Sequence, residues 1–473
     1  ALTHLDNCYS FKDFTARGYI CKTNTVSNTA FRGFGGPQGM LAIETILERV
    51  SRFLGIDLDA LRRENYYSAK NGIKTPYGQI VKNIKIEKII NEMETFAGLE
   101  KRKLLVERFN TSQINKNQPY RKGIAFMPAK FGISFNKVSL NQAGALVHVY
   151  TDGSVRLNHG GTEMGQGLFI KVAQVVSECF NIPIDYVHIS GTNTDEVPNT
   201  SATAASSGSD INGMAAWKAA TVIKQRMLKH ASKVFKKPPS SIEFKNGLIL
   251  SGNKSMTFKE LAFSCWENRI SLSSTGFYKT PKISWDQEKF KGSPYFYFTW
   301  GAAVSEAIID IDTGESRILR ADIIQDCGSS LNPLIDRGQI EGGFIQGIGW
   351  LTCEELYFNP EGKLLTLGPS TYKIPGSRDV PPEFNIKLLE NTPNEEKTIF
   401  RSKAVGEPPL LLSISHFLAL KNAVSMASET SNADLLNAPA TPSKILAAVH
   451  NDHSCLLYTS DACRRRLRCR SRW

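Results

Sequence analysis

The segment FRGFGGPQGM, residues 31–40, places Arg32 and Phe34 on either side of a glycine and directly ahead of a helical pattern. A cationic and an aromatic side chain in such a loop allow two interpretations. The segment is either a tight connection into the helix or a loop that binds a ligand. The loop by itself leaves both open, because short motifs of this kind also occur without function.

Four further segments rich in small residues accompany helical patterns. HGGTEMGQG, NTSATAASSGSD and KAVGEPP precede such patterns, and DRGQIEGGFIQGIG stands at or within a helix start. A helix N-terminus leaves backbone N–H groups without partners and carries a partial positive charge. Small residues let a ligand approach that backbone closely. Any one of these loops could be ordinary connecting structure, but five in one chain favour a single large, polar, anionic ligand, such as a phosphorylated one.

The first loop does not match the two familiar nucleotide-binding motifs. The fingerprint G-x-G-x-x-G would require glycine at position 38, where the chain has Gln38. The preceding CKTNTVSNTA is polar, whereas that fingerprint follows a buried strand. No glycine-rich loop ends in Gly-Lys-Ser or Gly-Lys-Thr, so a P-loop is absent. The predicted ligand is therefore neither a nicotinamide dinucleotide nor a nucleotide held by a P-loop.

Helices and hairpins must position these loops. Apolar residues recur at helical spacing between Pro37 and Val50, and Gly55 is the predicted end of that helix. The segments IDLDALRREN and KIEKIINEMETFAGLEKRKLLVERFN predict further helical stretches. Alternating apolar residues on both sides of a turn predict three β-hairpins, at Asp152-Gly153, Asn246-Gly247 and Thr313-Gly314.

Composition places the chain among globular proteins, since 41% of its 473 residues are hydrophobic and 22% are charged. No run of eighteen apolar residues exists, so no membrane span is predicted. Of the nine cysteines, three lie in the C-terminal tail and the others are scattered without a C-x-x-C pair. This argues against a zinc site, an iron–sulfur site and a disulfide framework within the chain, and we expect reduced thiols in a cytosolic protein.

The net charge of +12 is partly concentrated at the C-terminus, which weakens the case for a nucleic-acid partner. Residues 455–473, CLLYTSDACRRRLRCRSRW, contain six Arg and one Asp and so carry +5 of that charge. They lack a hydrophobic period and helix caps, and we expect a non-native tail there, with a natural basic arm as the alternative. The first residues contain no initiator Met and no leader, so we expect the chain to begin inside a longer protein.

Seven motifs resemble the molybdenum-cofactor domain of the xanthine dehydrogenase and xanthine oxidase family. They are TAFRGFGGPQGM, GGTEMGQG, VPNTSATAASSGSDING, DCGSSLNP, GQIEGGFIQGIG, GPSTYKIP and KAVGEPP. Each motif is weak alone, but they follow the family's order from residue 1 to residue 450. The resemblance covers the C-terminal part of such an enzyme. The iron–sulfur domains, the FAD domain and the first part of the molybdenum domain have no counterpart in this sequence.

The resemblance implies an α+β fold, a two-subdomain molybdopterin-binding domain with mixed sheets and with helices opened by glycine-rich loops. Residues 1–80 would be the C-terminal remainder of the first cofactor-binding subdomain, and residues 81–450 would form the second. In this family the pterin dithiolene binds the molybdenum. The metal would therefore lie near Arg32 and Glu407 without any protein ligand.

The resemblance also implies an enzyme, a molybdenum hydroxylase that converts hypoxanthine to xanthine and xanthine to urate with oxygen from water. In the full-length enzyme, electrons would pass to two [2Fe-2S] clusters, FAD and then NAD+ or O2, so this chain alone would be inactive. The partner would be a small heterocyclic substrate, with no nucleic acid and no membrane. A cytoplasmic homodimer is implied, with a peroxisomal location as an alternative.

Glu407, in KAVGEPP, matches the family's general base, which accepts a proton as oxygen is transferred to an electron-poor carbon of the heterocycle. A carboxylate suits this role if burial raises its pKa while the following helix start keeps it ionised. From the residues alone, the alternative is a helix cap ahead of Pro408 and Pro409.

The same motifs supply the other predicted site residues. Arg32 resembles the residue beside the cofactor on the metal's oxo side, and Phe34 resembles the ring that stacks on a flat substrate. Phe135, in KFGISF, resembles the second aromatic, which meets the substrate edge-on; a strand core residue is its alternative. Gly208 departs from the family pattern and would lack one side-chain contact to the pterin. Predicted cofactor-binding residues are Met164, Gly165, Gln166, Ala205, Ser206 and Gln339, and Ala204 and Ala205 would line the substrate pocket.

Two other functions stay open at this point. Aldehyde oxidase shares nearly all these loops, although KFGISF followed by LNQAGALVHVYTDG looks more like the xanthine enzymes. The second alternative is a non-catalytic, protein-binding relic of the fold. The joint retention of Arg32, Phe34 and Glu407 argues against such a relic.

Overall fold

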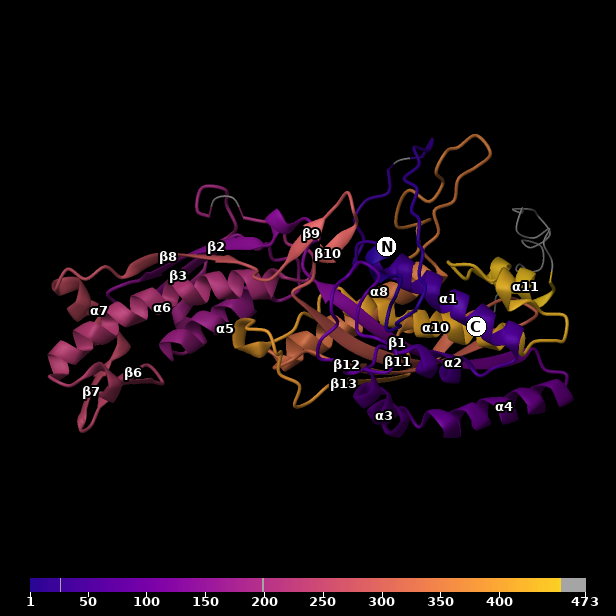
Figure 1. The fold of residues 1–473 in the computed structure, drawn as a ribbon, viewed down its shortest axis with the longest axis horizontal. Coiled ribbons are helices and arrows are strands. Elements are labelled where there is room, and N and C mark those ends of the chain that lie inside the picture. The colour runs from indigo at the N-terminus through magenta and orange to yellow at the C-terminus, as the bar shows by residue number, and fades with distance from the viewer. Residues whose placement is uncertain (26, 198–199, 452–473) are drawn as a thin grey trace.

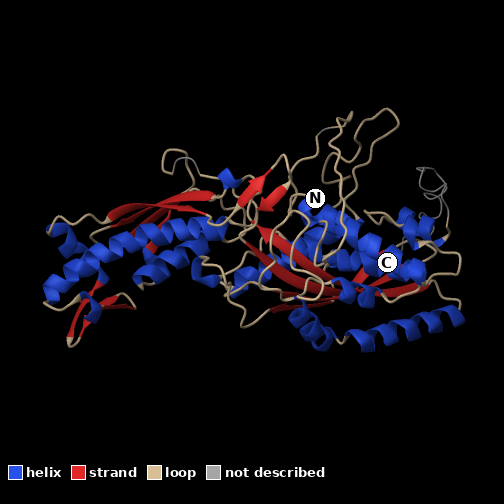
Figure 2. Cartoon of the chain, viewed as in Figure 1, coloured by secondary structure: helices blue, strands red, loops and turns tan. Residues whose placement is uncertain are grey.

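The computed structural model describes residues 1–25, 27–197 and 200–451. These residues form an elongated molecule with one sheet-and-helix body at each end of the view in Figure 1. Helices and strands are mixed throughout both bodies (Figure 2), in agreement with the predicted α+β class. Residues 455–473, the predicted non-native tail, lie outside the described residues, so that expectation stays a prediction.

Helices make up a large part of both bodies. They are α1 (Gly36–Leu54), α2 (Leu58–Asn65), α3 (Ile86–Ala97), α4 (Leu99–Asn115), α5 (Leu168–Phe180), α6 (Gly208–Phe235), α7 (Phe258–Glu267), α8 (Pro333–Thr352), α9 (Pro408–Leu412), α10 (Ile414–Ser425) and α11 (Pro442–Val449). No helix in the described ranges combines the length and the hydropathy that crossing a membrane would require.

The larger body is built on a sheet with the strand order β1-β11-β12-β13. β1 and β12 both pair antiparallel with β11, and β13 pairs parallel with β12. Helix α10 packs on one face, and α3 and α4 pack on the other (Figure 1). Because both faces are covered, β11 is buried along most of its length. The strands are β1 (Tyr120–Ile133), β11 (Tyr297–Asp310), β12 (Ser316–Gln325) and β13 (Glu383–Leu388).

The smaller body contains a sheet with the strand order β4-β3-β2-β8, covered by α6 and α5. β2 alternates between half-buried and buried residues, as a strand with one covered face should. Gly276 in β8 lets α6 lie very close, since a Cβ there would stand 2.1 Å from the carbonyl oxygen of Ala215. The strands are β2 (Gln142–Val149), β3 (Val155–His159), β4 (Val187–Ile189) and β8 (Ser273–Lys279).

All three predicted hairpins are confirmed. β2 pairs antiparallel with β3 around Asp152-Gly153, and β11 pairs antiparallel with β12 around Thr313-Gly314. The third hairpin joins β5 and β6 around Asn246-Gly247. In each case the glycine has a positive φ, which the tight turn requires. The remaining strands are β5 (Glu243–Lys245), β6 (Leu248–Ser251), β7 (Lys254–Thr257), β9 (Ser284–Asp286) and β10 (Lys291–Ser293).

The predicted first helix is confirmed, and one other helix prediction needs correction. α1 carries Pro37 in its first turn and ends at Gly55, whose left-handed backbone closes it. The helical stretch predicted over residues 85–110 is two helices, because Gly98 adopts φ 60° and separates α3 from α4. The segment DRGQIEGGFIQGIG, predicted to stand at or within a helix start, lies within α8, which begins at Pro333 and is capped by the Asn332 side chain.

The buried apolar residues form three clusters. One joins α10 to β1, β11 and α8, and another fills the space between the smaller sheet, α5 and α6. The third lies between the N-terminal residues, α3 and the larger sheet. The chain's first residues therefore belong to the larger body, where Asp6 and Lys130 form a buried ion pair at 2.8 Å. The domain boundary expected between residues 80 and 81 stays a prediction.

Candidate active site

Arg32 joins three of the predicted motifs. Its Nη2 donates to the carbonyl oxygen of Gln339 at 3.1 Å and to the side-chain Oε1 of the same residue at 3.2 Å. Its Nε donates to the carbonyl oxygen of Gly406, the neighbour of Glu407. Its Nη1 lies 3.4 Å from Oε1 of Gln346. The FRGFGG loop is thereby fixed to α8 and to the KAVGEPP loop, although these segments are far apart in sequence.

Glu407 meets a second set of predicted residues. The Gly33 N–H donates to its Oε1 at 3.2 Å, and the Ser206 hydroxyl donates to its Oε2 at 2.8 Å. The same hydroxyl accepts the backbone N–H of Glu407 at 2.7 Å. Although Glu407 stands at the N-cap position of α9, its side chain makes no capping hydrogen bond. The helix-cap alternative is therefore wrong, because the carboxylate turns toward Ser206 and Gly33.

The surroundings of Glu407 contain groups that raise the pKa of its carboxyl group and groups that lower it. Burial raises the pKa of its carboxyl group above the ordinary value, and this outweighs the hydrogen bonds from Ser206 and Gly33 and the charge of Arg32, which lower it. Burial also lowers the pKa of Arg32, against the attraction of Glu407. A buried carboxylate with a raised pKa accepts a proton more readily than an exposed one, and two donors on its ionised form hold it in place. This is the arrangement that a general base needs.

Glycines let the Arg32 guanidinium enter the space between the loops. A Cβ at Gly343 would lie 3.0 Å from the Arg32 guanidinium carbon. Gly33 has φ 95°, and a Cβ there would lie 2.6 Å from the Pro37 ring. Gly343 inside α8 thus permits the close packing of Arg32 against that helix.

The two predicted aromatic residues differ in exposure. Phe34 has a positive φ of 43° and is 75% exposed. Phe135 is half-buried and follows the end of β1, so the strand-core alternative is wrong. Its N–H donates to Oδ1 of Asn141 at 2.8 Å, and its carbonyl oxygen accepts from Nδ2 of Asn141 at 2.9 Å. Both rings keep surface that a flat ligand could contact, and no aromatic contact joins them within the described residues.

The loop that carries Ala204, Ala205 and Ser206 has an uncommon backbone. Ala205 and Ser206 adopt φ of 54° and 55°, values that few residues other than glycine take. This conformation aims the Ser206 hydroxyl at Glu407. Ala204 is exposed and Ala205 is half-buried, so both offer surface to a ligand. Strained loops of this kind are found at functional sites more often than elsewhere.

The loop that carries Met164, Gly165 and Gln166 closes on itself. The Gln166 side chain accepts the N–H of Met164 and donates to the carbonyl oxygen of Thr162 at 2.8 Å. Met164 is 65% exposed. Within the described residues, no hydrogen bond links this loop to Arg32 or Glu407, so the structure does not bring these three residues into the Arg32–Glu407 cluster.

Glu163 holds this loop and was missed by the sequence analysis. Its carboxylate accepts the N–H groups of Gly165 and Phe169 at 2.9 Å and of Gly167 at 3.0 Å. Burial raises the pKa of Glu163, but these backbone hydrogen bonds outweigh it, and the pKa lies below its ordinary value. The available signal was an acidic side chain in the glycine-rich loop that leads into a helix.

Helices α5 and α8 connect this loop to the Arg32 contacts. Lys171 in α5 forms a buried ion pair with Asp336 in α8, one helical turn before Gln339. A Cβ at Gly167 would lie 2.8 Å from the Ile335 side chain. The TEMGQG loop therefore lies against the first turn of α8, near the part of that helix that Arg32 contacts.

His159, also missed by the sequence analysis, is the last residue of β3 and directly precedes this loop in the chain. It is buried, and its Nδ1 accepts the N–H of Gly161 at 3.1 Å, so the ring proton belongs on Nε2. Within the described residues Nε2 has no hydrogen-bond partner. Burial lowers the pKa of His159 to about 4, so the ring is neutral at physiological pH. A buried donor without a protein partner suits a site that takes a polar ligand or water.

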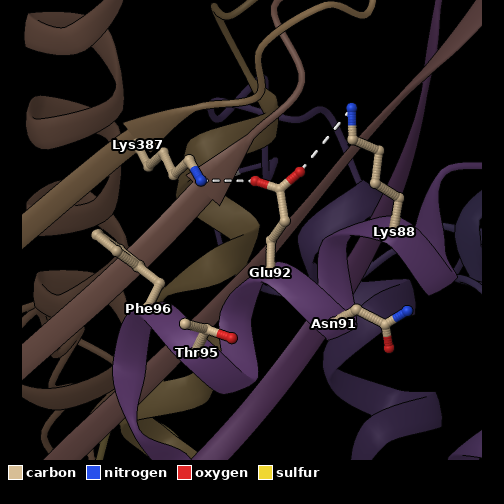
Figure 3. A pocket seen from close by; sticks show the side chains of 6 residues that line it. All are labelled: Lys88, Asn91, Glu92, Thr95, Phe96 and Lys387. Carbon is tan, nitrogen blue, oxygen red and sulfur yellow. Dashed lines mark ion pairs between the residues drawn. The ribbon is translucent and has the colours of Figure 1, made fainter.

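A groove of about 640 Å³ lies elsewhere, between α3 and β13 (Figure 3). None of the predicted site residues lines it. Its two lysines, Lys88 and Lys387, both pair with Glu92. The described residues contain no group of three or more His, Cys, Asp or Glu side chains placed to hold a metal ion.

Comparison with known proteins decides the family. A family model described as a molybdopterin cofactor-binding domain matches residues 93–381, and a second model of the same description matches residues 1–66. The chain belongs to the molybdopterin cofactor-binding domain family. The resemblance inferred from the seven motifs is thereby confirmed.

The relatives of this cofactor-binding chain agree with that assignment. It is 45% identical over 473 residues to xanthine dehydrogenase/oxidase from Felis catus. The match covers 98% of this chain and 34% of the relative. It is 46% identical over 448 residues to xanthine dehydrogenase/oxidase from Gallus gallus. This match covers 94% of this chain and 31% of the relative. The chain thus spans about a third of the length of these relatives.

A solved structure confirms the predicted fold. The aldehyde oxidoreductase from Desulfovibrio desulfuricans superposes with a TM-score of 0.75 over 94% of this chain and 44% of that one. The two sequences are 23% identical, so the likeness concerns the fold. The predicted α+β molybdopterin-binding architecture is therefore correct.

Proposed function

We propose that this chain is the cofactor-binding part of a molybdenum hydroxylase acting on purines, and that Glu407 is its general base. The observation that carries the proposal is one carboxylate with a raised pKa, that of Glu407, which accepts hydrogen bonds from Gly33 and Ser206 and is attracted by the charge of Arg32. Arg32 in turn donates to Gln339. The similarity to xanthine dehydrogenase/oxidase over nearly the whole chain supports the purine substrate.

The residues present fit an anionic, hydrogen-bonding cofactor. Arg32 supplies positive charge, and His159 is a buried donor without a protein partner among the described residues. Bound molybdopterin would supply the molybdenum that oxidises the substrate carbon with oxygen from water. The residues proposed to hold it are Arg32, Met164, Gly165, Gln166, Ala205, Ser206 and Gln339.

The chain's own contribution to the chemistry is orientation and proton transfer. Ser206 and Gly33 fix the two carboxylate oxygens of Glu407, so the base has a defined direction. In the ionised state it accepts one proton as the substrate is hydroxylated. Phe34 and Phe135 are proposed to hold the flat heterocycle, because aromatic pairs add about 0.5–1.5 kcal/mol beyond the burial of their area. Ala204 and Ala205 are proposed to line the pocket.

The remaining parts of the reaction belong to a longer protein. We propose that the full-length enzyme carries two [2Fe-2S] clusters and FAD, passes electrons to NAD+ or O2, and works as a cytoplasmic homodimer. The similarity to relatives about three times as long as this chain supports this proposal.

The decisive experiment replaces Glu407 by Gln in a full-length protein that carries this chain. Glutamine keeps the size of the side chain but cannot act as the base, and loss of a general base costs about 10²–10⁴ in rate. We expect a loss near the upper end of this range in xanthine-driven reduction per bound molybdenum, with normal molybdenum content. Rates with an aldehyde substrate, measured in parallel, test the purine preference.

A matched control is Glu260→Gln. Glu260 also lies at a helix start and accepts a hydrogen bond from a hydroxyl, that of Thr257 at 2.9 Å, but it belongs to α7 in the smaller body. This control should reduce its molybdenum at the parent rate. If Glu407→Gln also reduces its molybdenum at the parent rate, Glu407 is not the base.

A further inference from the structure

Tyr297, the first residue of β11, links the two segments on which the candidate site depends. Its hydroxyl donates to Oδ2 of Asp210 at 2.6 Å and accepts the N–H of Ala404 at 3.0 Å. Asp210 lies in the first turn of α6, shortly after Ser206, and Ala404 lies three residues before Glu407. The Tyr297 and Asp210 side chains are both buried.

These contacts close a ring with the hydrogen bonds of the site. Ser206 and Glu407 meet at one end of the ring, where Oγ and Oε2 are 2.8 Å apart. The chain segments 206–210 and 404–407 form its two sides. Tyr297 closes the other end, because one hydroxyl group serves both as the donor and as the acceptor.

Lys403 adds a second anchor beside Tyr297. Its Nζ donates to the carbonyl oxygen of Phe298 at 3.1 Å and forms a fully buried ion pair with Asp326 at 2.6 Å. Two consecutive residues of the Glu407 loop, 403 and 404, are thus held by two consecutive residues of β11. The start of the central strand is the fixed point against which this loop is placed.

We infer that Tyr297 and Asp210 are positioning residues, which hold the Glu407 loop against the Ser206 loop and so fix the direction of the Glu407 carboxylate. The inference rests on the proposed function. Without the hydroxyl, the Ala404 N–H and the Asp210 carboxyl would both lose their partner. An unpaired buried group costs more than the bond it made, so the loop would shift until the N–H is satisfied elsewhere.

Asp210 fits this role at any pH near neutral. Burial raises its pKa to about 7, against the hydrogen bond from Tyr297 and the charge of Lys171, which lower it. A carboxyl oxygen accepts a hydrogen bond from the Tyr297 hydroxyl whether or not the carboxyl group is ionised. Replacement by Asn, which keeps one acceptor oxygen, should therefore retain the ring.

The test uses the full-length enzyme with its cofactor and compares Tyr297→Phe with Tyr9→Phe. The Tyr9 hydroxyl also donates to a buried carboxylate, that of Glu44 at 2.6 Å, but it lies in a different apolar cluster. We expect Tyr297→Phe to lower kcat by about tenfold to a hundredfold, the scale of a small misplacement of a catalytic group. Its KM and molybdenum content should stay near those of the parent, and Tyr9→Phe should leave kcat unchanged.

Two readouts separate positioning from a general loss of packing. In the resting enzyme, backbone hydrogen exchange of residues 403–407 should speed up in Tyr297→Phe and not in Tyr9→Phe. The acid limb of kcat/KM should move to higher pH, because the Ser206 hydrogen bond that lowers the pKa of Glu407 is weakened. Asp210→Asn should keep the parent's hydrogen exchange and acid limb, whereas Asp210→Ala should match Tyr297→Phe in both readouts. If Tyr297→Phe does not fold, Asp210→Ala takes its place in the comparison with Tyr9→Phe.

The inference is wrong if Tyr297→Phe and Asp210→Ala equal Tyr9→Phe in kcat, in exchange and in the acid limb. Glu407→Gln is measured in the same series. If that variant keeps the parent rate, the proposed base is wrong, while the exchange of residues 403–407 still shows whether Tyr297 holds the loop.

Discussion

Glu407 and Glu163 both stand next to a glycine-rich loop that leads into a helix, yet their surroundings give them opposite properties. Glu163 accepts three backbone N–H groups at the start of α5, and its pKa is lowered. Glu407 is the N-cap residue of α9 but makes no capping hydrogen bond, and burial raises its pKa. One carboxylate stabilises its own loop, and the other is held by distant loops in a state that can take a proton.

The difference shows what separates a structural acid from a candidate base. Glu163 finds its partners within six residues, so its loop can form from local sequence alone. Glu407 finds Ser206 and Gly33, which lie 201 and 374 residues away. Its properties therefore exist only in the folded molecule.

The largest effect in this comparison should come from Glu407→Asp. The shorter side chain keeps the base but withdraws it by about one methylene, and a misplacement on the order of 1 Å can cost about 10² in rate. We expect that loss in xanthine-driven reduction per bound molybdenum. A parent-like rate would show that the direction of the carboxylate is unimportant and would break the comparison.

The next effect should come from Glu163→Gln and concerns stability. Glutamine has one acceptor oxygen instead of two, so one backbone N–H at the α5 start loses its partner, at a cost of about 1–2 kcal/mol on the scale of helix caps. Urea unfolding of parent and variant at pH 7 measures this difference.

The pH dependence of that stability difference has a definite sign. The folded-state pKa of Glu163 is lowered, so its stabilisation is present above the unfolded value of about 4.3 and is lost as pH falls through the folded-state pKa. The gap between parent and Glu163→Gln should therefore close in acid. A gap that stays constant would mean that the charge of Glu163 is not what holds the loop.

The smallest effect should come from Ser206→Ala. The Ser206 hydrogen bond lowers the pKa of Glu407, so its removal should raise that pKa further. The acid limb of kcat/KM should then move to higher pH, with a loss of about tenfold at the optimum, which corresponds to the lower end of the roughly 1.5–3 kcal/mol that one hydrogen bond to a charged group contributes. The pH profile of Glu163→Gln should keep the parent's acid limb.

The sequence predicted features that depend on neighbouring residues. The hairpins at Asp152-Gly153 and Thr313-Gly314 and the ends of α1 at Pro37 and Gly55 are set by turn and cap chemistry, which acts over a few residues. The order of the seven motifs was enough to indicate the family and, through it, the membership of Arg32, Ser206, Gln339 and Glu407 in one site.

Other predictions failed or fell short because the sequence pattern showed neither the backbone conformation of one residue nor a contact with a distant one. The residues around Gly98 have helical patterns on both sides, and only the left-handed backbone of that glycine separates α3 from α4. The sequence pattern of α8 did not show that Gly343 admits the Arg32 side chain. Phe135 and the loop of Met164 are placed in the structure, but their contact with a ligand stays a prediction.

The sequence by itself determined the local elements, the motif order and the residue types available for chemistry. Only the tertiary structure decided that Glu407 is not a cap, that Ser206 and Gly33 hold its carboxylate, and that Tyr297 joins Asp210 to Ala404. The physical reason is the separation along the chain of the residues that interact. Caps and turns are fixed by hydrogen bonds between near neighbours, whereas burial and long-range hydrogen bonds, which set a pKa, exist only after the chain has folded.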